Sequence, residues 1–123
     1  LELLGKLPHE PDVFVDVGAN IGQTLLSYKA AYPQGAYVGF EPNPFCIIYL
    51  HEVVRTNNLG NCTIIPAGLS DRTRSDRLYI GRHNQTNSGA TVERDIKDIG
   101  KKTGYPVCLF RLDDTELREA EAS

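Results

Sequence analysis

Val13-Phe14-Val15-Asp16-Val17-Gly18-Ala19-Asn20-Ile21-Gly22 joins an apolar run to a turn that contains two glycines. The run from Val13 to Val17 is rich in β-branched and aromatic residues, as expected for a central strand of a parallel sheet that is covered on both faces. A strand that passes through a glycine turn into a helix is typical of sites that bind a phosphate or a nucleoside. The same pattern also suits a simple corner in which the glycines serve backbone geometry alone.

A second acidic residue follows the next predicted strand. That strand covers Ala36 to Glu41, and Glu41 closes its carboxyl end. Ligands of open parallel sheets bind outside the carboxyl ends of the strands, where a carboxylate can accept hydrogen bonds from a ribose diol. Pro42-Asn43-Pro44 comes next and predicts a rigid turn, which favours the ribose role over that of an ordinary solvated residue at a strand end.

The remaining elements of the first half follow from periodicity and turn residues. Apolar residues at helical spacing predict a helix that starts near Ile21 and ends before Pro33-Gln34-Gly35. A second helix is expected from Pro44 to about Asn57, and a third strand over Cys62 to Ile65. Strands and helices that alternate in this way require right-handed crossovers. The sequence therefore predicts an α/β, Rossmann-like parallel sheet in the order 3-2-1 with flanking helices.

The charges near the turn indicate which nucleoside it would bind. The spacing from Gly18 to Gly22 departs from the dinucleotide pattern, because Asn20 stands where a middle glycine would be. Asp16 would repel a pyrophosphate and would attract a cationic or amino-bearing ligand. S-adenosylmethionine carries a sulfonium, an ammonium and a ribose diol, so the pattern favours it over NAD. An NAD-dependent oxidoreductase domain and a non-enzymatic nucleotide-binding module remain the alternatives.

The motifs together resemble the FkbM family of class I methyltransferases. The resemblance rests on Asp16 to Gly22 and Phe40 to Pro44 and, more weakly, on Ala67 to Asp71 and Leu112-Asp113-Asp114. It implies an S-adenosylmethionine-dependent O-methyltransferase that acts on a hydroxyl of a sugar, a glycan or a secondary metabolite. Gly68 stands where the family more often has alanine, a change of little expected consequence. The cofactor-binding residues expected on these grounds are Asp16, Gly18, Ala19, Asn20, Gly22, Glu41, Pro42, Asn43, Gly68, Leu69 and Asp71.

The chain ends before the strand with which the family continues. It also begins at Leu1 and contains no methionine, so we expect residues 1–123 to be a single, incomplete methyltransferase domain, its cofactor-binding half. The missing fourth strand would leave the strand at Val13 to Val17 as an exposed apolar edge, which favours self-association. This fragment alone is expected to be inactive, and the sequence names no catalytic residue.

Composition and charge argue against several classes of function. A chain of 123 residues with a formal net charge of −3 suits one domain and argues against a dedicated nucleic-acid surface. No apolar run approaches the roughly 20 residues that span a bilayer. The three cysteines lack the spacing of a zinc site or a disulfide framework, which predicts reduced thiols, no metal and a cytoplasmic location. The expected partner is a small-molecule or glycan substrate.

The pattern weakens beyond Asp71. Short strands are expected over Arg77 to Ile80 and Val107 to Leu112, and the polar segment 81–104 between them is expected to be a flexible loop or a flap over the substrate. Asp113 and Asp114 could form a catalytic or metal-binding pair, but we favour an N-cap for a helix from Thr115 to Ala122.

Overall fold

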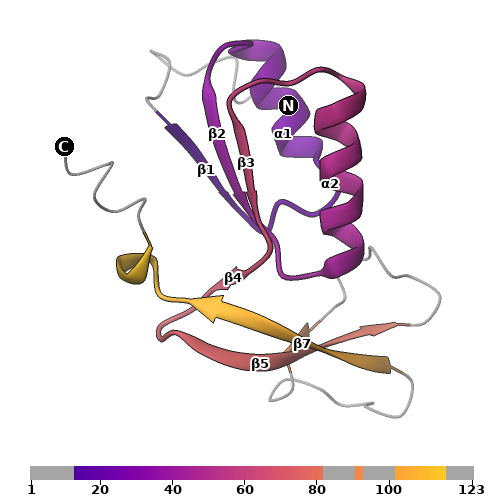
Figure 1. Ribbon diagram of the computed structural model, residues 1–123, viewed down its shortest axis with the longest axis vertical. Coiled ribbons are helices and arrows are strands. Elements are labelled where there is room, and N and C mark those ends of the chain that lie inside the picture. Colours follow the sequence, from indigo (N-terminus) through magenta and orange to yellow (C-terminus); the bar gives the residue numbers. More distant parts are fainter. Residues whose placement is uncertain (1–12, 82–90, 93–101, 116–123) are drawn as a thin grey trace.

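The computed structural model describes residues 13–81, 91–92 and 102–115 (Figure 1). Its first part alternates strands and helices: β1 (Val13–Val17), α1 (Gln23–Ala31), β2 (Ala36–Phe40), α2 (Pro44–Thr56) and β3 (Cys62–Ile65). The three strands are parallel and lie in the order β1-β2-β3. The predicted α/β, Rossmann-like sheet and its strand order are therefore confirmed.

Both helices lie on the same side of this sheet (Figure 1), as two successive right-handed crossovers in one direction require. The core between sheet and helices contains the fully buried side chains of Leu25, Tyr28, Tyr37 and Leu50. The ring of Phe14 stacks on that of Tyr28 with centroids 4.8 Å apart. The helix boundaries follow the sequence signals, because Pro44 is at the start of α2 and Asn57 is its C-cap.

At the amino-terminal end of this sheet, the buried side chain of Lys29 links α1 to two strands. The ammonium of Lys29 on α1 donates to the carbonyl oxygens of Gly35 and Gly60, each at 2.5 Å. Gly35 precedes β2 and Gly60 precedes β3, so one side chain joins α1 to the starts of two strands. Lys29 is only 4% exposed, and its two carbonyl partners supply the hydrogen bonds that burial of an ammonium requires.

A second sheet follows, in the order β4-β7-β5-β6. Its strands are β4 (Gly68–Leu69), β5 (Arg74–Gly81), β6 (Thr91–Val92) and β7 (Lys102–Phe110). β5 and β7 form a long antiparallel pair that lies below the carboxyl ends of β1, β2 and β3 in Figure 1. Leu78, Ile80, Val107 and Leu109 form a separate buried cluster, against which Phe45 of α2 packs.

Within the expected loop 81–104, the described residues Gly81, Thr91–Val92 and Lys102–Gly104 belong to strands. The rest of that segment lies outside the described residues, so its role as a flap stays a prediction. Leu112 was predicted to end the last strand, but β7 ends at Phe110 and Leu112–Asp114 forms a short 3-10 helix, η4.

Candidate functional site

The glycine turn lies at the carboxyl end of β1, where the backbone reverses tightly. Gly18, Asn20 and Gly22 all have positive φ angles, of 76°, 53° and 101°. The amides of Gly18 and Ala19 both donate to the carbonyl of Phe40, at 2.9 and 3.1 Å, and so fix the turn to the end of β2. A Cβ built on Gly18 would meet no atom within 4 Å. The space beside Gly18 is therefore open, and a ligand can approach the backbone there.

Glu41 ties this turn to the start of α2. One carboxylate oxygen accepts the amide of Asn20 at 2.8 Å, and the other accepts the amide of Asn43 at 2.9 Å. Glu41 is only 7% exposed, so these two charge-assisted hydrogen bonds compensate its burial. Each oxygen keeps a second lone pair, which is the capacity that a ribose hydroxyl would need.

Cys46 adds a second link between the turn and α2. Its thiol lies 3.3 Å from the side-chain oxygen of Asn20 and donates to it. Burial, with the charge of Glu41 as a smaller cause, raises the pKa of Cys46 to about 11. The thiol therefore stays protonated near neutral pH and acts as a donor, not as a nucleophile.

Asp16 has a partner that sequence reasoning missed. The hydroxyl of Tyr37 on β2 donates to the Asp16 carboxylate at 2.6 Å. Tyr37 is 1% exposed, and its ring lies in the core between the sheet and the helices. The available signal was Gly39, two residues further along the same face of the strand, because a glycine within a strand marks a close approach of other atoms.

Ala19, Gly22 and Asn43, which were also predicted to bind the cofactor, face the protein. Ala19 is buried in the core, and a Cβ on Gly22 would meet Leu50 and Val53 of α2 at 3.5–3.6 Å. Asn43 is the N-cap of α2, and its side chain accepts the amide of Phe45. These three residues therefore pack the turn against the core and form the start of α2.

Gly68, Leu69 and Asp71 lie next to the second sheet. Gly68 and Leu69 form β4, which pairs with β7. A Cβ on Gly68 would come within 2.7 Å of the Leu109 side chain, so the glycine found here gives Leu109 room to pack. Asp71 is exposed and accepts hydrogen bonds from Ser70 and Arg74, which lower its pKa, Ser70 being the larger cause. No described contact joins Asp71 to the glycine turn.

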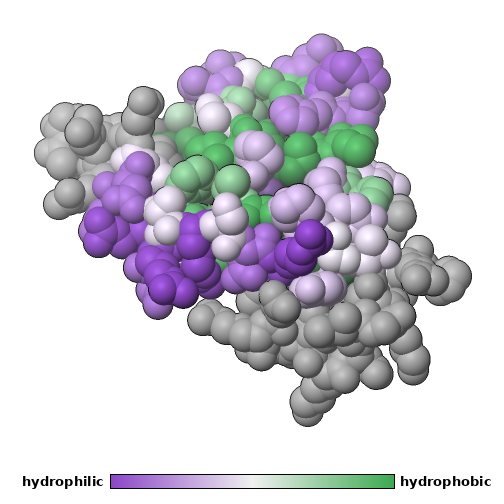
Figure 2. All heavy atoms as spheres, turned by 60° about the horizontal axis from the view of Figure 1, so that its bottom comes forward, coloured by the Kyte–Doolittle hydropathy of each residue, from purple (hydrophilic) through white to green (hydrophobic). Residues whose placement is uncertain are grey.

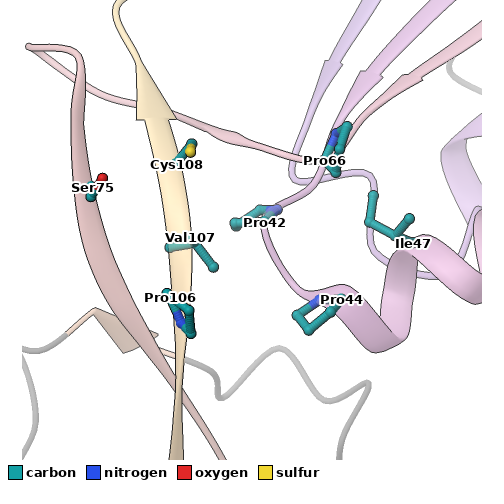
Figure 3. Close-up of a pocket in the computed structure, with 8 residues that line it drawn as sticks. All are labelled: Pro42, Pro44, Ile47, Pro66, Ser75, Pro106, Val107 and Cys108. Atoms are coloured by element: carbon teal, nitrogen blue, oxygen red, sulfur yellow. The ribbon is translucent and has the colours of Figure 1, made fainter.

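A cavity of about 370 Å³ lies between the proline-containing segments at the ends of the strands and the β5–β7 pair (Figure 3). Pro42, the residue after Glu41, points into this space toward Val107 of β7 (Figure 3). The walls are mainly apolar, and the polar side chains among them are Ser75 and Cys108. The lining residues are Pro42, Pro44, Ile47, Pro66, Ser75, Pro106, Val107 and Cys108.

Asp113 and Asp114 lie in η4. The Asp114 carboxylate accepts the hydroxyl of Thr73 at 2.5 Å and pairs with Arg111 at 3.1 Å. These two partners lower the pKa of Asp114, Thr73 more than Arg111. The extended backbone of Thr115 shows that no helix starts at that residue, and 116–122 lies outside the described residues.

Two features are absent from the described residues: a cluster of metal-ligating side chains and a helix that could span a membrane. Across 13–81, 91–92 and 102–115, no group of three His, Cys, Asp or Glu side chains could hold a metal ion. Cys46, Cys62 and Cys108 are free thiols, buried, half-buried and exposed respectively. In the same ranges, no helix has the length and apolar character needed to cross a membrane.

Comparison with known proteins finds similarity to one methyltransferase. Over 68 residues, or 54% of this chain, the sequence is 38% identical to methyltransferase sdnD of Sordaria araneosa. The matched stretch is 26% of that relative, so the chain corresponds to about a quarter of its length. No family model and no solved structure matches the chain.

Proposed function

We propose that this chain is the cofactor-binding part of an S-adenosylmethionine-dependent methyltransferase of the FkbM type. The observation that supports it most is the position of two acidic residues beside the open glycine turn. Asp16 is near the carboxyl end of β1, and Glu41 directly follows the adjacent parallel strand β2. Open α/β sheets bind their ligands at this edge. The similarity to methyltransferase sdnD supports the same reaction class.

The described residues fit the groups that this cofactor presents. The open space beside Gly18 would receive the part of the ligand that lies against the turn. The half-buried Asp16 would pair with the ammonium of the amino-acid portion. Glu41 would accept a ribose hydroxyl through a lone pair that the amides of Asn20 and Asn43 leave unused.

The chain's own contribution to the reaction is positioning. The cofactor supplies an electrophilic methyl group on a positively charged sulfur. Asp16, Gly18 and Glu41 would hold it in one orientation at the sheet edge, and the surrounding chain would limit water there. We assign no catalytic base.

The acceptor is proposed to be a hydroxyl on a sugar, a glycan or a secondary metabolite. The apolar cavity beyond Pro42 favours a metabolite with an apolar skeleton, because its walls offer sugar hydroxyls few polar partners. Cys108 lines this cavity and is exposed, so a bound acceptor should slow its alkylation. Alkylation of the half-buried Cys62, which does not line the cavity, is the matched control.

Isothermal titration calorimetry tests the cofactor assignment. The full chain should bind S-adenosylhomocysteine more tightly than NAD, whose pyrophosphate Asp16 would repel. Glu41→Ala should weaken binding of S-adenosylhomocysteine by about 1–3 kcal/mol, because the ribose loses a charged acceptor. Gly18→Val should weaken it at least as much by filling the open space beside the turn. Equal or tighter binding of NAD would overturn the proposal.

The matched control for Gly18→Val is Asn58→Val. Asn58 also has a positive φ angle, of 51°, but it lies in the connection between α2 and β3, at the opposite end of the sheet. Both variants strain a left-handed backbone. A loss of ligand affinity in Gly18→Val that Asn58→Val does not share therefore reports on the ligand site. If a folded Glu41→Ala protein bound S-adenosylhomocysteine with wild-type affinity, Glu41 would not be part of the binding site.

A further inference from the structure

We infer that Tyr37 is a positioning residue, whose hydroxyl holds the Asp16 carboxylate in the orientation that receives the ligand's ammonium. This inference rests on the proposed function. It adds a residue of the buried core to a site that would otherwise consist of the glycine turn and the two strand-end acids.

The strand register places these two residues on one face of the sheet. Phe14 is opposite Tyr37, and Asp16 is opposite Gly39. Because side chains alternate along a strand, all four positions share the face that packs against the helices. The Tyr37 side chain therefore runs along its own strand toward the carboxyl end and meets Asp16 at 2.6 Å.

Gly39 makes this path possible. A Cβ built at that position would lie 2.8 Å from the Tyr37 hydroxyl oxygen and 2.9 Å from its ring. Real Cβ atoms essentially never come so close, so any other residue would displace the tyrosine. Phe14 and Tyr28 hold the ring from other sides, with centroids 6.2 Å from that of Tyr37. The hydroxyl is thus held in place by rigid neighbours.

The direction of the hydrogen bond is also fixed. Burial, followed by the hydrogen bond to Asp16 and its charge, raises the pKa of Tyr37 far above its ordinary value. The phenol therefore keeps its proton and donates, and the carboxylate accepts. One oxygen of Asp16 is engaged in this way, and the other oxygen is assigned to the ligand's ammonium.

Tyr37→Phe tests the role, because it removes the hydroxyl and keeps the ring. Two probes are titrated by calorimetry: S-adenosylhomocysteine, which carries the amino-acid portion, and 5′-methylthioadenosine, which lacks it. We expect the variant to lose about three- to tenfold in affinity for the first probe and to bind the second unchanged. A purely structural role for Tyr37 would weaken both probes alike and would overturn the inference.

Tyr28→Phe is the matched control. Tyr28 lies in the same core cluster, but its hydroxyl donates to the carbonyl of Ala36 at 3.0 Å, away from Asp16. This variant should bind both probes as the wild type does. Asp16→Asn should also lose affinity for S-adenosylhomocysteine selectively, and adding Tyr37→Phe to it should cost nothing further, since the two residues act as a unit.

The outcomes separate this inference from the proposed function. If the wild type binds neither probe, the cofactor assignment fails and the role of Tyr37 fails with it. If the wild type prefers S-adenosylhomocysteine and Tyr37→Phe keeps the same preference, the inference fails alone. Independent effects of Tyr37→Phe and Asp16→Asn in the double variant would also overturn it.

Discussion

At the carboxyl end of β2, the Glu41 carboxylate holds two segments that are far apart in the sequence. Its bonds to the amides of Asn20 and Asn43 fasten the glycine turn and the first residue before α2. Glu41 was predicted as a ribose acceptor, and the structure gives it a structural task as well. A Glu41 variant should therefore be measured for both its free energy of unfolding and its ligand affinity, because loss of either role would impair the protein.

Cys46 leads to a prediction about alkaline pH. Its thiol has a pKa of about 11 in the folded protein, against an ordinary value of 9.0. Above about pH 9 the thiol loses its proton in the unfolded chain before it does so in the folded protein. Deprotonation therefore stabilises the unfolded state, and the free energy of unfolding falls. Between about pH 9 and 11 the wild type should lose up to about 2 kcal/mol more than Cys46→Ala.

Urea unfolding at several pH values measures this difference. Tyr37 and Cys62 also have raised pKa values, and both remain in the variant, so each protein loses some stability at high pH. The informative quantity is the difference between the two curves. Stability curves that run parallel from pH 8 to 11 would contradict the pKa of Cys46.

At the scale of single elements, β2 carries a tight packing constraint at Gly39. Gly39→Ala places a Cβ 2.8 Å from the hydroxyl oxygen of Tyr37 and 3.2 Å from the Ala19 side chain. Overpacking of this kind costs about 1–3 kcal/mol, so the variant should unfold at lower denaturant concentration. Gly60→Ala is the control, because a Cβ there meets nothing within 4 Å. Equal stability of both variants would show that the Tyr37 ring can move.

The elements of the first half could be predicted because local signals mark them. The apolar run at Val13–Val17, the proline at Pro44 and the turn residues before β2 and β3 each act within a few residues. The hydrogen bond between Tyr37 and Asp16 could not be predicted in this way, because it depends on the register between two strands. The packing of Gly22 against α2 likewise arises only when two helices share a face of the sheet.

The second sheet was harder to predict for a related reason. β5 and β7 are longer than the apolar runs that marked them, since their ends gain stability from pairing with each other. Arg74 illustrates the difference: it would pass for a solvated residue, yet its side chain is 15% exposed and bonds to Ser70 and Asp76. Both partners are near Arg74 in the sequence, but its burial depends on the fold around it, which leaves no local pattern.

At the scale of the whole molecule, two apolar clusters are joined where α2 meets the second sheet. Phe45 at the start of α2 contacts the Tyr105 ring of β7 edge-on, with centroids 5.4 Å apart.

The face turned forward in Figure 2 shows apolar surface bordered by polar residues. Exposed apolar side chains among the described residues include Val17 and Ile48, at 60% and 62% exposure.

The outer edge of β1 leads to a prediction about assembly. Among the described strands β1 pairs only with β2, and Val17 at its end is exposed. Such an apolar edge invites pairing with a second copy of the chain. Light scattering should show association that increases with concentration, and Val17→Lys should reduce it. Ile48→Lys, on α2, should not, and a monomer at every concentration would contradict the prediction.

The two hydrogen bonds of the buried Lys29 ammonium have a consequence for insertions into this chain. The ammonium donates to the carbonyls of Gly35 and Gly60 at once, so it restrains the connections before β2 and β3. An added residue in either connection would draw one carbonyl away and leave a buried cation with half of its partners. Surface connections usually accept extra residues at little cost. Here both connections are held by one side chain of a third element, so an added residue in either should destabilise the fold more than an insertion in an ordinary surface connection.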